Sequence, residues 1–212
     1  MIFTYIFNYL SYCLVMKKTL YLMRHGQTLF NLRKKIQGAC DSPLTDEGIR
    51  QAKIAGLYFK ENGITFDHAY SSTQERASDT LEIVTDFNMS YERLKGIKEW
   101  NFGLFEGESE DLNPPHEPNE RSYGDFFVKF KGESEKMVEK RVTETLTEIM
   151  EKENHNTVLA VSHGAACYAF LLRWAPEFPF TGIPNCSVFK YEYEDGKFTL
   201  IELIKHDFNR EI

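Results

Sequence analysis

The sequence has few cysteines, and they lie too far apart for the usual metal or disulfide patterns. Only four occur in 212 residues, without Cys-x-x-Cys spacing or paired histidines nearby: Cys13, Cys40, Cys167 and Cys186. This scatter argues against a zinc knuckle and against a disulfide framework. We therefore expect four reduced thiols, most of them packed inside a cytoplasmic protein.

The chain also lacks an excess of positive charge. It carries 32 acidic residues against 25 basic ones, which gives a net charge of −7 with neutral histidines. Such a surface as a whole repels nucleic acid, so no nucleic-acid partner is expected. A phosphate-bearing ligand would instead need a local cluster of positive groups. The length and the apolar share of 42% suit one α/β domain with a single core.

No apolar run reaches the roughly 20 residues that cross a membrane. Residues 1–15 come nearest, being uncharged and rich in aromatic and aliphatic side chains, but polar residues interrupt them. A signal peptide would carry positive charge before the apolar run, whereas the first two lysines follow it. We favour Met16 as the true start. The prediction is an apolar N-terminal extension over 1–18, without stable membrane insertion, followed by a single domain over 19–212.

Strand-like and helix-like segments alternate along the rest of the chain. Thr45 and Gly63 mark the two ends of one helix, and the offset of Ser72 and Glu75 predicts a capping box that starts another. The expected strands are 19–23, 66–71, one within 91–105 that runs into a loop, 157–161, 187–193 and 198–204. The expected helices are 45–63, one from 72 onward, 133–152 and 164–174. This alternation predicts an α/β fold, a three-layer sandwich with a mainly parallel central sheet flanked by helices.

The segment 106–132 differs from its surroundings. It is acidic, holds three prolines, and ends in a cluster of aromatic residues between Tyr123 and Phe130. A free linker would not keep so many large rings, so we interpret the segment as an excursion inserted into the domain. The rings favour packing, with a lid over a pocket as an equal alternative. The acids Glu106, Glu108, Glu110 and Asp111 are expected to form a solvated face.

Basic side chains follow three of the predicted strands. Arg24 and His25 come directly after the first, Arg76 opens the helix after the second, and His163 follows the strand 157–161. Ligands of open parallel sheets bind beyond the carboxyl ends of the strands, so we expect these side chains to converge. Two arginines can hold phosphate oxygens while a neutral histidine attacks phosphorus. Their positive charge opposes a divalent cation, so no metal and no other cofactor is expected.

The same residues resemble a known family. The motifs are Arg24-His25-Gly26 after a strand, Asn31 six residues past the histidine, Arg76 within 71–77, and Ser162-His163-Gly164. Together, in this order, they resemble the histidine phosphatase superfamily, in its phosphoglycerate-mutase-like branch. The resemblance covers about residues 19–204.

The resemblance implies a role for each matching residue. His25 would accept the phosphoryl group, and Glu99, within the matching pattern 97–107, would protonate the leaving oxygen and then activate water or a second hydroxyl. Gln27 stands where the family often has an acid, and we interpret it as a tolerated variant. The residues implied to bind the phosphate or line the substrate pocket are Arg24, Asn31, Gln37, Gly38, Arg76, His163 and Gly164.

Three functions fit this pattern. We favour a metal-independent phosphatase for a small phosphorylated metabolite, because the excursion holds only Arg121, Lys129 and Lys131 among many acids. A cofactor-dependent phosphoglycerate mutase would be expected to place more basic residues there. The third alternative is a catalytically idle phosphate-binding module. The sequence does not select a substrate, and the oligomeric state is left open, with a homodimer among the alternatives.

Overall fold

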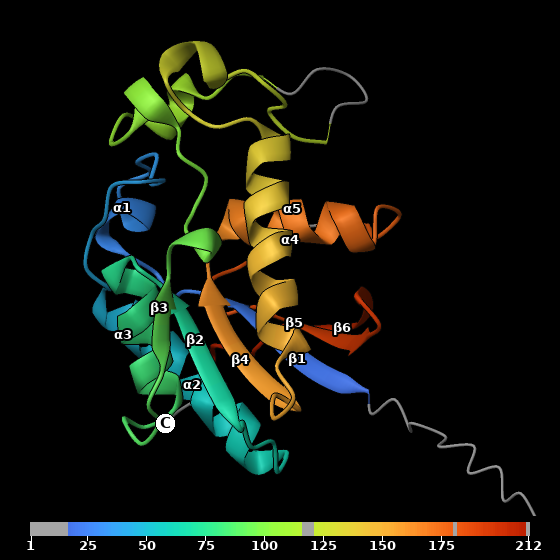
Figure 1. Cartoon of the computed structure of the whole chain (residues 1–212). Helices are drawn as coiled ribbons and strands as arrows, with labels where there is room; N and C mark the ends of the chain where they lie inside the picture. Colours follow the sequence, from blue (N-terminus) through green and yellow to red (C-terminus); the bar gives the residue numbers. More distant parts are fainter. Residues whose placement is uncertain (1–16, 116–120, 180–181, 211–212) are drawn as a thin grey trace, which may run out of the picture.

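The computed structural model describes residues 17–115, 121–179 and 182–210. Residues 1–16, which include Cys13 and the proposed start at Met16, lie outside the described residues. In the described part of the chain one sheet has the strand order β3-β2-β4-β1-β5-β6 (Figure 1). Its strands are β1 (Lys18–Arg24), β2 (His68–Ser72), β3 (Glu92–Leu94), β4 (Thr157–Ser162), β5 (Val188–Glu194) and β6 (Lys197–Ile204).

The sheet is mostly parallel, as predicted. Strands β3, β2, β4 and β1 run parallel to their neighbours, while β5 pairs antiparallel with β1 and forms a hairpin with β6. The turn of that hairpin holds Asp195 and Gly196, both with positive φ. The predicted strand within 91–105 is only three residues long, and short 3-10 turns follow it.

Helices cover both faces of the sheet, which confirms the three-layer architecture (Figure 1). Along β1, Leu20 and Leu22 pack into one core with α4 and α5, whereas Tyr21 and Met23 pack into a second core with α2 and α3. Successive strand residues point to opposite faces, so a strand covered on both sides must be apolar throughout. The helices are α1 (Leu29–Leu32), α2 (Asp46–Glu61), α3 (Glu75–Val84), α4 (Glu135–Glu151) and α5 (Gly164–Trp174).

The ends of α2 follow their sequence signals. Thr45 is the N-cap, and its hydroxyl accepts the N–H of Gly48 at 3.0 Å. Gly63 lies just past the end with φ of +64°, a left-handed conformation in which glycine is not strained. The last turn of α2 also carries Lys60, whose charge suits the carboxyl end of a helix.

The capping box predicted from Ser72 and Glu75 is wrong. Gln74 is the N-cap of α3, and it makes no side-chain capping bond. The Ser72 hydroxyl lies 2.6 Å from His163 Nε2 instead, and the carboxylate of Asp41 accepts the N–H of Glu75 at 2.6 Å. A loop distant in sequence therefore caps α3, which leaves Ser72 for the histidine.

The excursion lies over the carboxyl ends of the parallel strands, above the sheet in Figure 1. Its described parts include the 3-10 turns η3 (Glu110–Leu112) and η4 (Val128–Phe130), and η2 (Gly103–Phe105) comes just before it. Phe127 is fully buried and has edge-to-face contacts with Trp100, Phe102 and Phe105, so these rings form a core.

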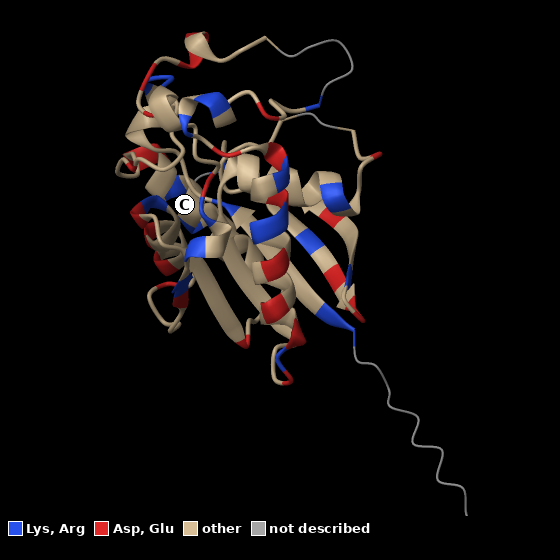
Figure 2. Cartoon of the chain, turned by 45° about the horizontal axis from the view of Figure 1, so that its top comes forward, with Lys and Arg blue, Asp and Glu red and all other residues tan. Residues whose placement is uncertain are grey.

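Acidic and basic residues are mixed along the described parts of the chain. Figure 2 shows Lys and Arg positions interspersed with Asp and Glu along α4 and over the excursion. Among the helices of the described residues, none is both long enough and apolar enough to span a membrane.

Candidate active site

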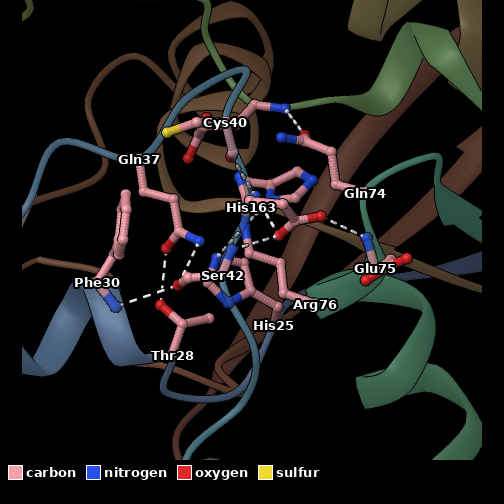
Figure 3. Close-up of polar contacts among 12 residues, drawn as sticks. His25, Thr28, Phe30, Gln37, Cys40, Ser42, Gln74, Glu75, Arg76 and His163 are labelled. Carbon is pink, nitrogen blue, oxygen red and sulfur yellow. Dashed lines mark hydrogen bonds and ion pairs between the residues drawn. The ribbon is translucent and has the colours of Figure 1, made fainter. Parts of the chain in front are cut away.

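The parallel pairing of β1 and β4 brings the two predicted histidines together. Arg24 and Ser162 are register partners at the ends of these strands, so His25 and His163 leave adjacent strands side by side. The N–H of His25 donates to Ser162 O at 3.0 Å, and the two imidazole centres lie 5.2 Å apart. Both side chains are buried. Figure 3 shows them together with Arg76, which reaches them from α3.

His25 has one ring nitrogen fixed by the backbone. Its Nδ1 lies 2.7 Å from the carbonyl oxygen of Gly26, which can only accept, so Nδ1 carries the proton and Nε2 keeps its lone pair. Burial lowers the pKa of His25 well below its ordinary 6.5, and the charges of Arg76 and Arg24 lower it further. Gly26 permits this backbone path, because a Cβ there would lie 2.6 Å from Gly48 O. The neutral tautomer is the one that a nucleophile needs.

His163 is held between a hydroxyl and a guanidinium. Its Nε2 lies 2.6 Å from Ser72 Oγ, and its Nδ1 accepts from Arg76 Nε at 3.1 Å. Burial is the main cause that lowers the pKa of His163 well below 6.5, followed by the charges of Arg76 and His25. The same Arg76 N–H lies 3.3 Å from His25 Nε2, so one donor sits between the two rings.

Arg24 is buried with a donor that has no partner. One of its terminal nitrogens donates to Ile183 O at 2.5 Å, but Nε forms no hydrogen bond with any described residue. An unpaired buried donor on a charged group is costly, and burial lowers the pKa of Arg24. Because the side chain lines the cavity beside His25, an anion there would satisfy the donor.

Arg76 is fully buried and is fixed by the loop at residues 38–41. Its terminal nitrogens donate to Gly38 O at 3.0 Å, to Cys40 O at 2.9 Å and to Asp41 Oδ1 at 2.8 Å. The Asp41 carboxylate thus offsets a cation that the amino end of a helix disfavours. The Nε–H remains directed at the two histidines.

Glu99 lies at the amino end of α5 and lines the same cavity as His25. Its carboxylate is buried and accepts the backbone N–H groups of Trp100 at 2.8 Å, Ala166 at 2.9 Å and Ala165 at 3.1 Å. The partial positive charge at a helix N-terminus stabilises a carboxylate in this position. Its own N–H donates to the side chain of Gln74 at 2.9 Å, which joins it to the start of α3.

The remaining predicted residues divide into two groups. Asn31, Gln37 and Gly164 line the cavity, and Asn31 Oδ1 also accepts from Thr28 N at 3.2 Å within the cap of α1. Gly38 instead faces Arg76 through its carbonyl oxygen. A Cβ on Gly38 would lie 2.1 Å from Trp100 O, so its absence permits a close backbone approach.

The cavity in front of His25 has a volume of about 650 Å³, enough for a small metabolite. Beyond the histidine its walls carry two cations and one acid, namely Lys35, Arg121 and Glu110. Lys35 was not among the predicted site residues, because it lies outside the motifs and outside the excursion. Glu108, Glu110 and Asp111 are exposed, as expected for a solvated face, although Glu110 also lines this cavity. Glu106 is the exception, because its carboxylate accepts backbone N–H groups.

Acid should weaken the fold through the two buried histidines. Each is neutral in the folded chain and would gain a proton near pH 6.5 when unfolded, so stability is complete above that pH and falls as pH drops below it. Each histidine should contribute a slope of up to about 1.4 kcal/mol per pH unit. Urea unfolding between pH 5 and 7.5 measures this slope. In the His163→Gln variant, the slope of the unfolding free energy against pH should be smaller by the contribution of one proton. An unchanged slope would contradict the conclusion that His163 is neutral in the folded chain.

The chain belongs to the histidine phosphatase superfamily (branch 1), whose family model matches residues 20–205. Within the described residues, no three His, Cys, Asp or Glu side chains gather as metal ligands would. The family and this geometry together define a phosphoryl-transfer class whose members are phosphatases or mutases.

The proteins similar to this chain include phosphoglycerate mutases and a phosphatase. The probable phosphoglycerate mutase GpmB of Yersinia pestis (strain Pestoides F) is 32% identical over 185 residues, covering 83% of this chain and 85% of the relative. The crystal structure of phosphoglycerate mutase from Bacillus anthracis is 29% identical with a TM-score of 0.81, covering 90% and 93%. A phosphoserine phosphatase from Entamoeba histolytica, solved with phosphoserine, is 27% identical with a TM-score of 0.70, covering 88% and 96%.

Proposed function

We propose that this protein is a metal-independent phosphatase that acts on a small phosphate ester through a phosphohistidine at His25. The observation that carries the proposal is the shared Nε–H of Arg76, which lies within 3.3 Å of both His25 Nε2 and His163 Nδ1. A phosphoryl oxygen could take that proton donor, which would bring phosphorus within reach of His25 Nε2. Arg24, which lines the same cavity as His25, supplies a donor without a partner at its Nε.

The first step forms the bond between His25 Nε2 and phosphorus and breaks the bond from phosphorus to the ester oxygen. Arg24 and Arg76 neutralise the negative charge on the phosphoryl oxygens in the transition state. Such electrostatic stabilisation is the main source of catalysis in phosphoryl transfer. Once a phosphoryl oxygen takes the Nε–H of Arg76, Nδ1 of His163 is free to carry the ring proton and donate it to those oxygens, while Nε2 accepts from the Ser72 hydroxyl. Glu99, in its acid form, gives its proton to the departing oxygen, so the leaving group departs as a neutral alcohol.

The second step returns the catalyst to its starting state. Glu99, now a carboxylate, takes a proton from water while the water oxygen attacks phosphorus. The phosphorus–nitrogen bond breaks, inorganic phosphate leaves, and His25 recovers its lone pair on Nε2. Its Nδ1 keeps the proton that donates to Gly26 O throughout, which offsets the positive charge of the phosphorylated ring.

Water is favoured as acceptor because of the charges in the cavity wall. A mutase must hold a second dianionic group there while the first is transferred. Lys35 and Arg121 are the cations in that wall, and Glu110 accompanies them. Burial raises the pKa of Glu110, whereas nearby Arg24 lowers it. A carboxylate so near Arg24 would oppose a second dianion.

A phosphoglycerate mutase is the second candidate. The names of the relatives from Yersinia and Bacillus favour it, and Lys35 with Arg121 could bind a carboxylate. In that case a second hydroxyl of the substrate replaces water in the second step. The third alternative, an idle binding module, would be expected to have lost His25, Glu99 or His163, and this chain keeps all three.

The test measures release of phosphate from p-nitrophenyl phosphate in the presence of EDTA. Turnover should be unchanged by the chelator, because arginines and histidines supply the charge that a metal would otherwise supply. Loss of activity in EDTA that magnesium restores would contradict metal independence. Interconversion of 2- and 3-phosphoglycerate without phosphate release would favour the mutase. Binding of inorganic phosphate without either reaction would favour the idle module.

A further inference from the structure

The carboxylate of Glu106 binds a series of backbone N–H groups. It accepts from three consecutive residues, Gly38 at 3.0 Å, Ala39 at 2.7 Å and Cys40 at 3.0 Å, and also from Phe102 at 2.9 Å. Consecutive N–H groups that converge on one anion form a concave site of the kind that binds phosphate in other proteins. Here a side chain of the same chain fills it, so the loop is fixed from this side.

The carbonyl groups of the same loop point to the active site. Gly38 O accepts from Arg76 at 3.0 Å and from Gln74 Nε2 at 2.5 Å, while Cys40 O accepts from Arg76 at 2.9 Å. Glu106 and Arg76 therefore bind opposite sides of one short stretch of backbone. Figure 3 shows Cys40 and Gln74 beside Arg76 and the two histidines.

The fit between the loop and Glu106 leaves little freedom. A Cβ on Gly38 would lie 2.3 Å from Glu106 Oε1, so the loop cannot move closer or carry a larger residue there. The Cys40 thiol lies in the same contact, and burial together with the neighbouring Glu106 raises its pKa to about 12. The thiol should therefore react slowly although Cys40 is partly exposed.

We infer that Glu106 is a positioning residue, which holds residues 38–40 in the one shape that directs Arg76 at the phosphoryl group. The same loop reaches Glu99, because Gln74 binds Gly38 O with its nitrogen and accepts the N–H of Glu99 with its oxygen. Glu106 thus supports both the phosphate-binding arginine and the proton donor. This role rests on the proposed function of Arg76 and Glu99.

The experiment compares Glu106→Gln with Glu108→Gln, an exposed acid two residues along the chain. The amide nitrogen introduced at 106 would face backbone N–H groups, so the loop should lose charge-assisted hydrogen bonds. We expect the Kd for inorganic phosphate to rise about tenfold or more and kcat/KM for p-nitrophenyl phosphate to fall about tenfold to a hundredfold, with the fold intact by circular dichroism. Glu106→Asp should recover part of the loss, and Glu108→Gln should match the wild type.

Alkylation of Cys40, followed by peptide mass spectrometry, reports on the loop without any catalysis. It should be faster in Glu106→Gln, and inorganic phosphate should slow it in the wild type because a ligand on Arg76 also stabilises the loop. Absence of this protection would overturn the inference even if Glu106→Gln fails to fold.

The Arg76→Ala variant distinguishes a wrong role for Glu106 from a wrong proposed function. If Arg76→Ala weakens phosphate binding but a folded Glu106→Gln does not, the role of Glu106 is wrong and the proposed function stands. If neither substitution changes phosphate affinity, the proposed function itself fails. A fall in thermal stability of Glu106→Gln with unchanged kinetics would make Glu106 a structural residue only.

Discussion

His25→Ala should lose phosphatase turnover by about 10⁴-fold, the largest effect expected for any single substitution. The alanine removes the side chain to which we assign the covalent intermediate, whereas the proposed phosphate-binding residues Arg24, Arg76 and His163 remain. Steady-state hydrolysis of p-nitrophenyl phosphate measures the loss. In the wild type, rapid acid-free denaturation should trap one phosphoryl group on the peptide that contains His25, and the variant should trap none.

The control for this substitution is His155→Ala. His155 is another buried histidine, and its Nε2 lies 2.7 Å from the Tyr70 hydroxyl. It comes just before β4, whereas His163 comes just after this strand. Its loss should lower stability but leave turnover within about twofold, because it is far along the strand from the reacting groups. Equal turnover in His25→Ala and the wild type would disprove the phosphohistidine mechanism.

The parts of the site that follow strands were predictable because their signals are local. Arg24 and His25 come directly after an apolar run, and His163 comes directly after another. Parallel pairing of such runs leaves few arrangements for the residues at their carboxyl ends. The structure accordingly places His25 and His163 within hydrogen-bonding distance of Arg76.

The capping of α3 was not predictable, because a distant contact replaced a local one. Ser72 and Glu75 have the spacing of a capping box, and taken alone that pattern favours a bond between them. In the folded chain the Ser72 hydroxyl meets His163, 91 residues away, and Asp41 caps the helix from 34 residues upstream. A sequence pattern within four residues carries no information on either partner.

Glu106 shows the same limit more strongly. In sequence it is one acid among several, and a solvated face was the natural expectation. Its hydrogen-bond partners at residues 38–40 lie 66 to 68 positions away, and all of them are backbone groups, which every sequence has. The residue in the loop that reflects this contact is Gly38. A glycine is required there because a Cβ would collide with Trp100 O and Glu106 Oε1, and the sequence does not show that these atoms are its neighbours.

The effect of Glu99→Gln on turnover should depend on how readily the leaving group of the substrate departs without a proton. An alkyl phosphate should lose about 10²- to 10⁴-fold in kcat, because its alkoxide needs a proton to depart and glutamine has none to give. With p-nitrophenyl phosphate the first step needs no proton, so the variant should release a burst of p-nitrophenolate equal to the enzyme and then stall. The stall arises because no carboxylate remains to activate water, and the phosphohistidine should accumulate.

Rapid-mixing absorbance and intact-protein mass measure the burst and the accumulated phosphoryl group, with Glu108→Gln as the matched control. Equal losses for the alkyl and aryl esters, without a burst, would mean that Glu99 only positions its neighbours. The basis of that alternative is the contact of its carboxylate with the N–H groups of Trp100, Ala165 and Ala166, two of which belong to the first turn of α5. The burst separates the two roles, since a cap that is lost cannot permit the first step while blocking the second.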